Sequence, residues 1–199
     1  MGDAESRVWS VDMKVHDYHD GNRDLQERFG TTKLADRMAE RAVDTLGANE
    51  RNFIENANMF FLATCDDRGL PTCSYKGGDH GFVKVLDNRT LAFPNYDGNG
   101  KYQSMGNLLQ NAHAGMLFID FDGQQRLRIQ GVATIDENDP LMAEYHEAQF
   151  IVRIQITESY PHCPRYIHRQ VMVEKAEFVP ELGRETPQPG WKSRPEYQI

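Results

Sequence analysis

The sequence has little cysteine, no long apolar run and no basic tract. Its three cysteines are odd in number and lack framework spacing, which argues against a disulfide scaffold and fits a reducing compartment. No apolar run approaches the roughly 20 residues that span a bilayer, and the acidic N-terminus lacks the apolar core of a signal peptide. A net charge of −8 disfavours nucleic acid as a partner. We therefore expect a cytoplasmic protein that binds neither membrane nor nucleic acid.

Metal-ligand spacing is also missing. The chain has seven histidines and three cysteines, but neither Cys-x-x-Cys nor His-x-x-x-His occurs. Without such spacing, no single element places two ligands on one face. We predict no metal site.

The length of 199 residues favours one large domain with appendages. The hydrophobic content of 39% is on the low side of average but is enough for a core. We divide the chain into an irregular N-terminal arm over residues 1–30, a main domain over 31–180 and a C-terminal tail over 181–199.

Helical patterning is confined to the start of the main domain and to short later segments. Thr31 and Thr32 are candidate caps for a helix that Gly47 closes. Its apolar stripe, with a spacing of four residues, is predicted to be core and consists of Leu34, Met38, Ala42 and Leu46. Asn49 is a candidate cap for a second helix whose Phe53, Ile54 and Ala57 face inward. Asp139-Pro140 starts a further helix, through about Gln149.

From Met59 onward, short apolar strands recur at hairpin spacing. Turn sequences such as Asp66-Asp67-Arg68-Gly69 separate them, and Pro94 is expected to end one of them. The predicted strands are 59–64, 71–76, 82–86, 91–93, 114–121, 126–135, 151–156 and 171–179. Seven or eight short strands with few, brief helices favour an antiparallel β-barrel.

The most distinctive stretch follows the strand at 91–93. Between Asn95 and Gly106 almost every residue is polar, Gly or Tyr, and the loop then enters a helix near Ser104. A loop of this kind presents free backbone N–H donors at a helix start, which suits an anion, most often a phosphate. An ordinary strand-to-helix connection that uses Gly for its turns explains the same residues equally well.

Six sequence blocks, in this order, carry a resemblance to a known family: FFLATCDDRGLPTCSYKGG, GFVKVLD, TLAFPNYDGNGKYQSMGNL, GMLFIDF, RLRIQG and HCPRYI. They resemble the pyridoxamine 5′-phosphate oxidase-related flavoproteins, and within them the branch described as predicted flavin-nucleotide-binding proteins. The resemblance covers about Phe53 to Val179. It implies a mainly β fold, a six-stranded antiparallel split β-barrel with flanking helices. It also implies a homodimer with FMN in a groove at the dimer interface.

The resemblance also implies a set of cofactor-binding residues. Carried over by position, the residues from Ser74 to Gly78 lie along the flavin, and the strand from Phe82 to Val85 lies beneath its ring. The loop from Asn95 to Asn107 surrounds the ribityl chain and phosphate. The set is Ser74, Lys76, Gly77, Gly78, Phe82, Val83, Lys84, Val85, Asn95, Tyr96, Asn99, Gly100, Lys101, Ser104, Asn107 and Arg126. The oxidases have a Ser-Arg-Lys run in this loop, whereas this loop is longer and contains only Lys101. Lys76 or Lys84 is then the candidate for a second positive charge.

Two features have competing interpretations. Arg126 and Arg128 share one face of a strand, where arginine either meets the cofactor or is ordinary surface charge. Cys163, in His162-Cys163-Pro164-Arg165, is a candidate nucleophile, but an unactivated cysteine is more often a small buried hydrophobe. We assign no catalytic residue, because a bound flavin carries the redox chemistry itself.

The sequence thus predicts an FMN-dependent oxidoreductase that acts on an unknown small molecule. A flavin-binding or storage protein without turnover is the first alternative. A cleft that holds the deazaflavin F420 or haem, as in relatives of the family, is the second. Oxidation of pyridoxamine phosphate itself is not expected, because the characteristic C-terminal Arg-Leu-x-Pro segment is missing.

Overall fold

A computed structural model describes residues 18–197 of the chain. The chain divides into two compact units, with the division between Ala42 and Val43. This division falls later than the predicted boundary at residues 30 and 31. The second unit contains the whole sheet and the tail.

The first unit contains two short helices, α1 (Asp20–Arg28) and α2 (Thr32–Ala39). The predicted irregular arm is therefore helical over α1, while its residues 1–17 lie outside the described part of the chain. α2 ends at Ala39 instead of reaching Gly47, and Leu34 and Met38 are exposed. The prediction that their stripe is core was wrong for these two. Only Leu46 of the stripe is buried, in the core of the second unit.

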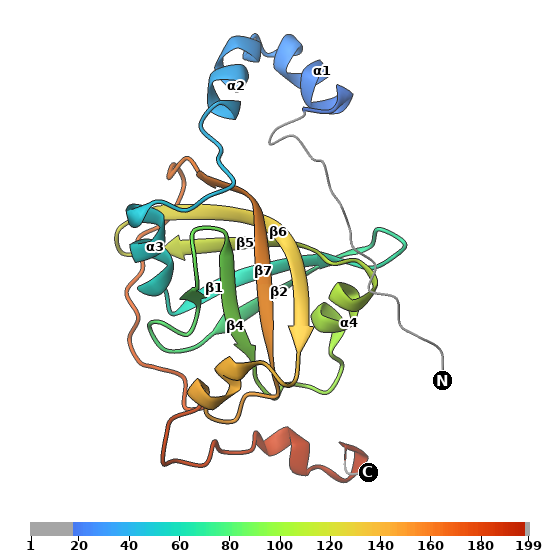
Figure 1. Cartoon of the computed structure of the whole chain (residues 1–199), viewed down its shortest axis with the longest axis vertical. Coiled ribbons are helices and arrows are strands. Elements are labelled where there is room, and N and C mark those ends of the chain that lie inside the picture. The colour runs from blue at the N-terminus through green and yellow to red at the C-terminus, as the bar shows by residue number, and fades with distance from the viewer. Residues whose placement is uncertain (1–17, 198–199) are drawn as a thin grey trace. The chain divides into compact units, whose positions relative to one another are not determined.

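The second unit is built on one antiparallel sheet of seven strands in the order β2-β1-β5-β6-β7-β4-β3 (Figure 1). The strands are β1 (Met59–Cys65), β2 (Pro71–Gly77), β3 (Lys84–Val85), β4 (Thr90–Asn95), β5 (His113–Asp120), β6 (Gln125–Asp136) and β7 (Phe150–Pro161). β6 and β7 are long, and their pairing shifts register between Gln130 and Gly131. The sheet curves into the predicted mainly β split barrel, with the two-residue β3 as a seventh strand.

Two strand predictions differ from the structure. Pro94 does not end its strand, because β4 continues to Asn95 and Pro94 lies opposite Ile151 of β7. β3 pairs with β4 only at Leu91 and Ala92, so the other edge of the strand at Pro94 needs no N–H donor. The segment predicted as a strand over 171–179 is irregular.

Helices close the barrel and its loops. α3 (Ala48–Glu55) begins at Gly47, whose N–H donates to the Glu50 carboxylate, and buries Ile54 as expected. α4 (Gln103–Gln110) packs on β1, β2 and β6. The helix predicted from Asp139 to Gln149 is only a short 3-10 turn, η1 (Pro140–Glu144). The tail ends in η2 (Gly190–Ser193) and η3 (Pro195–Tyr197).

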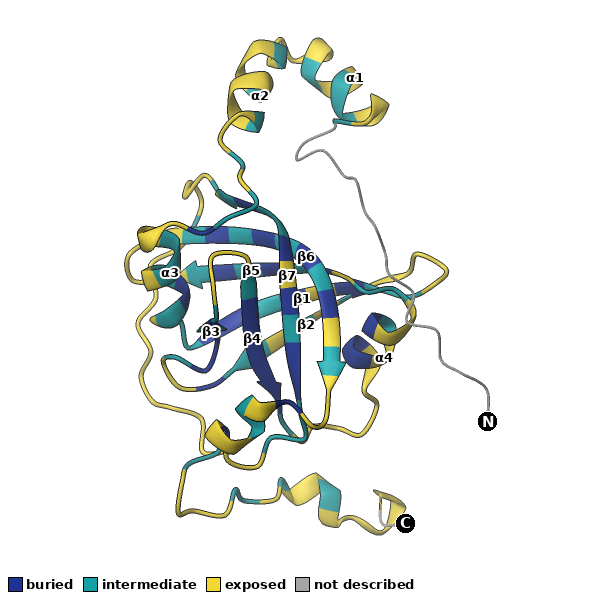
Figure 2. Cartoon of the chain, viewed as in Figure 1, coloured by how far each residue is buried: buried dark blue, intermediate teal, exposed yellow. Residues whose placement is uncertain are grey.

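The core lies inside the curved sheet and under α3 and α4 (Figure 2). Alternate residues of β1, β5, β6 and β7 face it, whereas β2 contributes no buried residue. The rings of Phe93 and Phe118 pack against that of Phe60, with centroids 5.0 and 5.2 Å from it. The opposite face of β1, β2, β5 and β6 carries the intervening residues. No helix in the described part of the chain is both long and apolar enough to cross a membrane.

Candidate functional site

A cavity of about 370 Å³ lies between β2, the loop after β4 and the start of α4. We call it the lysine cavity, because Lys76 of β2 and Lys101 of the loop both line it. It brings together half of the predicted cofactor-binding residues, from two strands, a loop and a helix. These are Ser74, Lys76, Asn95, Tyr96, Asn99, Gly100, Lys101 and Ser104.

Positive charge in the lysine cavity is unopposed. No Asp or Glu is among its lining residues, and neither lysine makes an ion pair within residues 18–197. Burial lowers the pKa of Lys76, because its ammonium is partly removed from water. In a chain of net charge −8, two unpaired ammonium groups in one cavity form a site for an anion.

Two serine hydroxyls, from Ser74 and Ser104, also line the cavity. The Ser104 hydroxyl donates to the Ser74 hydroxyl at 3.0 Å and so joins α4 to β2. The predicted ligand Asn107 has a different role, since its amide donates to the hydroxyls of Thr64 and Thr72 at 3.1 and 3.2 Å. Asn107 therefore anchors α4 on the sheet and does not line the cavity.

The loop before α4 turns its backbone toward the cavity. Gly100 has φ of +73°, which glycine adopts without strain, and the Lys101 N–H donates to the Asn99 side chain at 3.0 Å. Tyr102 follows with φ of 46°, an unusual value for a residue with a side chain. The first turn of α4 then lines the cavity through Gln103 and Ser104. Its N–H groups have no acceptor within the helix and favour an anion.

The glycine pair at the end of β2 has a packing role. A Cβ on Gly78 would lie 2.5 Å from the Phe82 ring, and a Cβ on Gly77 would lie 2.7 Å from the Tyr75 ring. Neither glycine lines the lysine cavity. The space that glycine leaves here is filled by the protein's own rings, not left open for a ligand.

The remaining predicted residues lie elsewhere. The side chains of Phe82, Val83 and Val85 are buried in the core, and none of them lines the lysine cavity. Lys84 is paired with Glu144, which leaves Lys76 as the second cation beside Lys101. Arg126 lies at the start of β6 in a separate small cavity, and its Nε is buried without a hydrogen-bond partner.

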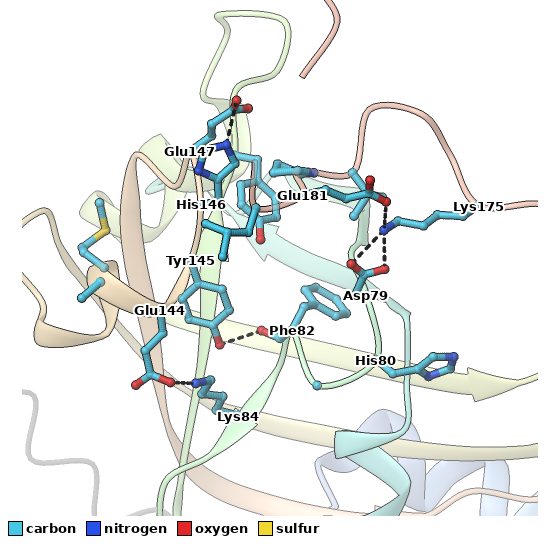
Figure 3. Close-up of a pocket in the computed structure, with 17 residues that line it drawn as sticks. Asp79, His80, Phe82, Lys84, Glu144, Tyr145, His146, Glu147, Lys175 and Glu181 are labelled. Atoms are coloured by element: carbon cyan, nitrogen blue, oxygen red, sulfur yellow. Dashed lines mark hydrogen bonds and ion pairs between the residues drawn. The ribbon is translucent and has the colours of Figure 1, made fainter. Parts of the chain in front are cut away.

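A second, larger cavity of about 900 Å³ shares Tyr96 with the first. Figure 3 shows the residues that line it. We call it the tail cavity, because residues 179–182, where the tail begins, form one wall. Lys175 holds that wall by ion pairs with Asp79 at 2.7 Å and Glu181 at 2.6 Å. Tyr145 donates from its hydroxyl to the Phe82 carbonyl at 3.0 Å.

Tyr96 lines both cavities. Burial, together with the nearby Asp79 carboxylate, raises the pKa of Tyr96 to about 12. The phenol therefore keeps its proton at any physiological pH. Tyr96 is therefore a neutral residue common to the lysine cavity and the tail cavity.

Cys163 is exposed, so the expectation of a small buried hydrophobe was wrong. Arg165 donates from Nε to its sulfur at 3.1 Å, and this contact lowers the pKa of the thiol. Cys163 lines neither the lysine cavity nor the tail cavity. Among the described residues, no group of three His, Cys, Asp or Glu side chains is placed to hold a metal ion.

Several residues around the lysine cavity were not predicted. Thr72, Cys73, Tyr75, Gly98, Tyr102, Gln103 and Met105 also line it. Most of these flank predicted residues along the same strand or loop, so the strand and loop assignments could have found them. Gln149 contacts Asn95 and Tyr102 of the loop, although it lies far from both in the sequence. No local sequence pattern indicates this contact.

Comparison with known proteins agrees with this architecture. The sequence model of the pyridoxamine 5′-phosphate oxidase family matches residues 46–178, which is most of the chain. No curated protein matches the chain.

Among solved structures, a pyridoxamine 5′-phosphate oxidase-type protein from Lactobacillus delbrueckii is 23% identical with a TM-score of 0.50, over 59% of this chain and 95% of its own. HupZ from Group A Streptococcus is 16% identical with a TM-score of 0.47, over 58% and 93%. HutZ, a haem storage protein from Vibrio cholerae, is 18% identical with a TM-score of 0.42, over 58% and 94%. At these identities the likeness concerns the fold alone.

The family match spans the whole barrel. It begins at Leu46, in the core beside α3, and ends at Phe178, before the tail, so it includes every strand and both lysines of the cavity. The chain belongs to the pyridoxamine 5′-phosphate oxidase family.

Proposed function

We propose that this protein is a flavoprotein whose lysine cavity binds the phosphate of FMN. The observation that carries the proposal is the pair Lys76 and Lys101, unpaired in one cavity that no carboxylate lines. A phosphate dianion prefers cations supplemented by hydroxyl, amide and backbone N–H donors. The cavity offers all of these through Ser74, Ser104 and the first turn of α4.

The rest of the cofactor needs an extended surface beside the cavity. At about 370 Å³, the lysine cavity suits the ribityl phosphate, with the ring beyond it. β2 is an edge strand, so its outer backbone groups have no partner strand within the described residues and are free to meet a flavin edge. When bound, FMN supplies hydride and electron transfer, while the protein anchors the phosphate and orients the ring.

The tail cavity is our candidate for the small-molecule substrate. It adjoins the lysine cavity through Tyr96, whose neutral O–H is a hydrogen-bond donor at the boundary. It is large enough for a small organic molecule. The flavin and a substrate would then lie on the two sides of one residue.

We also propose that the protein is a homodimer, formed through the outer face of the sheet. A row of side chains crosses that face, with Phe61 directly opposite both Tyr75 of β2 and Leu117 of β5. Tyr75 is 62% exposed. Such an apolar row on a sheet face is typical of an interface. Because Tyr75 also lines the lysine cavity, the cofactor would lie beside the interface.

Haem and F420, the two alternative cofactors, need different groups in the cavity. Haem iron in proteins is commonly held by histidine, and no histidine lines the lysine cavity. F420 carries a phosphate as FMN does, and the two lysines suit either cofactor. The cavity therefore distinguishes FMN from haem better than it distinguishes FMN from F420. A protein that binds FMN without turnover would use the same contacts.

The absorption spectrum of the purified protein, with mass analysis of the ligand released by heat, tests the cofactor. FMN in stoichiometric amount, or its uptake by the colourless protein, is the expected result.

Lys101→Ala should weaken FMN binding by about 1–3 kcal/mol. Lys33→Ala, which removes an exposed lysine from α2, should not. A Soret band, released F420, or failure to take up FMN would contradict the proposal. Reduction by NADH or NADPH without air would separate an enzyme from a passive binder.

A further inference from the structure

Both ends of the loop that carries Lys101 are held by one side chain. The loop runs from Asn95, the last residue of β4, to Tyr102, the residue before α4. Gln149 Oε1 accepts a hydrogen bond from the Asn95 amide at 2.9 Å and another from the Tyr102 hydroxyl at 3.1 Å. The Gln149 backbone N–H also donates to the Asn95 carbonyl at 2.8 Å. We call residues 95–102 the anion loop.

The end of the anion loop is a strained point. Tyr102 has φ of 46°, in the left-handed region, which a residue with a side chain keeps only where its surroundings fix it. The surroundings here are the bond to Gln149 and the Phe150 ring, whose centroid is 6.4 Å from that of Tyr102. These partners are the first residue of β7, Phe150, and the residue before it, Gln149, and neither lines the lysine cavity.

The conformation at Tyr102 decides where the anion-binding groups point. Lys101 is its neighbour on one side, and the first turn of α4 begins on the other. A change of backbone angle at Tyr102 would redirect the ammonium and the free N–H groups together. The anion loop has no apolar anchor of its own, because residues 97–101 are all exposed.

We propose that Gln149 is a positioning residue for anion binding: it bridges the two ends of the anion loop and so holds Lys101 and the α4 N-terminus toward the cavity. Gln149 does not line the cavity and acts only through the loop. The inference rests on the proposed function for the identity of the anion, but its structural part does not depend on any ligand.

The first test uses the protein without FMN. Two amides report on the backbone at Tyr102, because the Lys101 N–H donates to the Asn99 side chain and the Gly106 N–H donates to the Tyr102 carbonyl at 2.6 Å. Their hydrogen exchange should be about tenfold faster in Gln149→Ala than in the unchanged protein, because the conformation at Tyr102 is no longer fixed. Gln155→Ala is the matched control, because Gln155 lies on β7 and donates to the Arg89 carbonyl, away from the cavity. Exchange at Lys101 and Gly106 that Gln149→Ala leaves unchanged would overturn the inference.

The second test compares FMN with riboflavin, which lacks the phosphate. Gln149→Ala should weaken FMN binding by about tenfold and riboflavin binding by less than about twofold. Tyr102→Phe, which keeps the ring beside Phe150 but removes the hydroxyl, should have a smaller effect in the same direction. The two effects should not add, because both variants remove the same hydrogen bond. Equal losses for FMN and riboflavin would indicate a general structural role and contradict positioning.

The failure of this inference differs from the failure of the proposed function. If Lys101→Ala abolishes the preference for FMN while Gln149→Ala and Tyr102→Phe preserve it, only the role of Gln149 is wrong. If the protein binds neither flavin, the proposed function fails. Hydrogen exchange in the FMN-free protein then still decides whether Gln149 holds the loop.

Discussion

Lys76 combines a cost in stability with a gain in binding. Its ammonium is partly buried, has no carboxylate beside it, and has a lowered pKa for that reason. A partly buried, unpaired charge destabilises the folded state, and a bound anion compensates for it. Residues that are unfavourable for folding and favourable for a ligand are typical of functional sites.

Lys76→Met is therefore expected to have opposite effects on folding and binding. It should raise the free energy of unfolding of the FMN-free protein by about 1 kcal/mol. It should also weaken FMN binding by about tenfold or more, because a charge-assisted contact is lost. Urea unfolding and an FMN titration measure the two effects. A variant that is both less stable and unchanged in FMN affinity would show that Lys76 is an ordinary structural lysine.

The pH dependence has a defined sign. The pKa of Lys76 in the folded protein lies below its ordinary value of 10.5, which we take for the unfolded chain. Between these two values the unfolded chain holds the proton that the folded protein has released. The contribution of Lys76 to stability therefore rises with pH through that alkaline interval, and Lys76→Met should remove this rise.

At the scale of single residues, the sequence was informative where a motif is contiguous. The resemblance assigned Lys76, Lys101 and Ser104 to one site, and the structure brings them to one cavity, because the strand and the loop that carry them are each continuous in sequence. Asn107 was assigned to the cofactor, yet its amide bonds two threonines of the sheet. Gln149 was not found, since only the folded chain brings it to the anion loop.

Among the elements, the end of β2 shows that a glycine pair can serve packing. The resemblance places Gly77 and Gly78 along the flavin, and in the structure the space beside them is filled by Tyr75 and Phe82. Phe82 is itself part of the core and stacks on Phe60 at 5.8 Å. The junction between β2 and β3 is therefore fixed by packing before any ligand binds.

Gly78→Ala should destabilise the FMN-free protein by about 1–3 kcal/mol, because its Cβ would lie 2.5 Å from the Phe82 ring. Gly98→Ala is the control, since a Cβ there meets nothing within 4 Å. Chemical denaturation without FMN measures both. Gly78→Ala with unchanged stability but lost FMN binding would restore the interpretation that Gly78 makes room for the ligand.

Elements were predicted well where local signals suffice. The hairpin between β1 and β2 and the start of α4 follow from turn residues and alternation, which act over a few positions. The helix ending at Gly47 and the strand over 171–179 were wrong, because contacts elsewhere decide them. Val43 leaves the helical path to exchange two backbone hydrogen bonds with Ser159, at 3.0 and 2.6 Å.

For the whole molecule, the main prediction is dimerisation. Light scattering should give twice the chain mass of 22.8 kDa. Leu117→Glu, which places a charge at the β5 end of the row of Tyr75, Phe61 and Leu117, should shift the protein toward monomer and weaken FMN binding. A folded monomer that binds FMN as tightly as the unchanged protein would contradict both the dimer and the position of the cofactor beside it.

If the lysine cavity recognises a phosphate, it must bind FMN more tightly than riboflavin, and the ratio of the two dissociation constants measures that recognition. Flavin fluorescence titrations with FMN and with riboflavin give this ratio for the unchanged protein. Two charge-assisted contacts, from Lys76 and Lys101, predict that FMN binds about 100-fold more tightly or better. Equal affinities for FMN and riboflavin would show that the cavity does not recognise the phosphate, and would contradict the account.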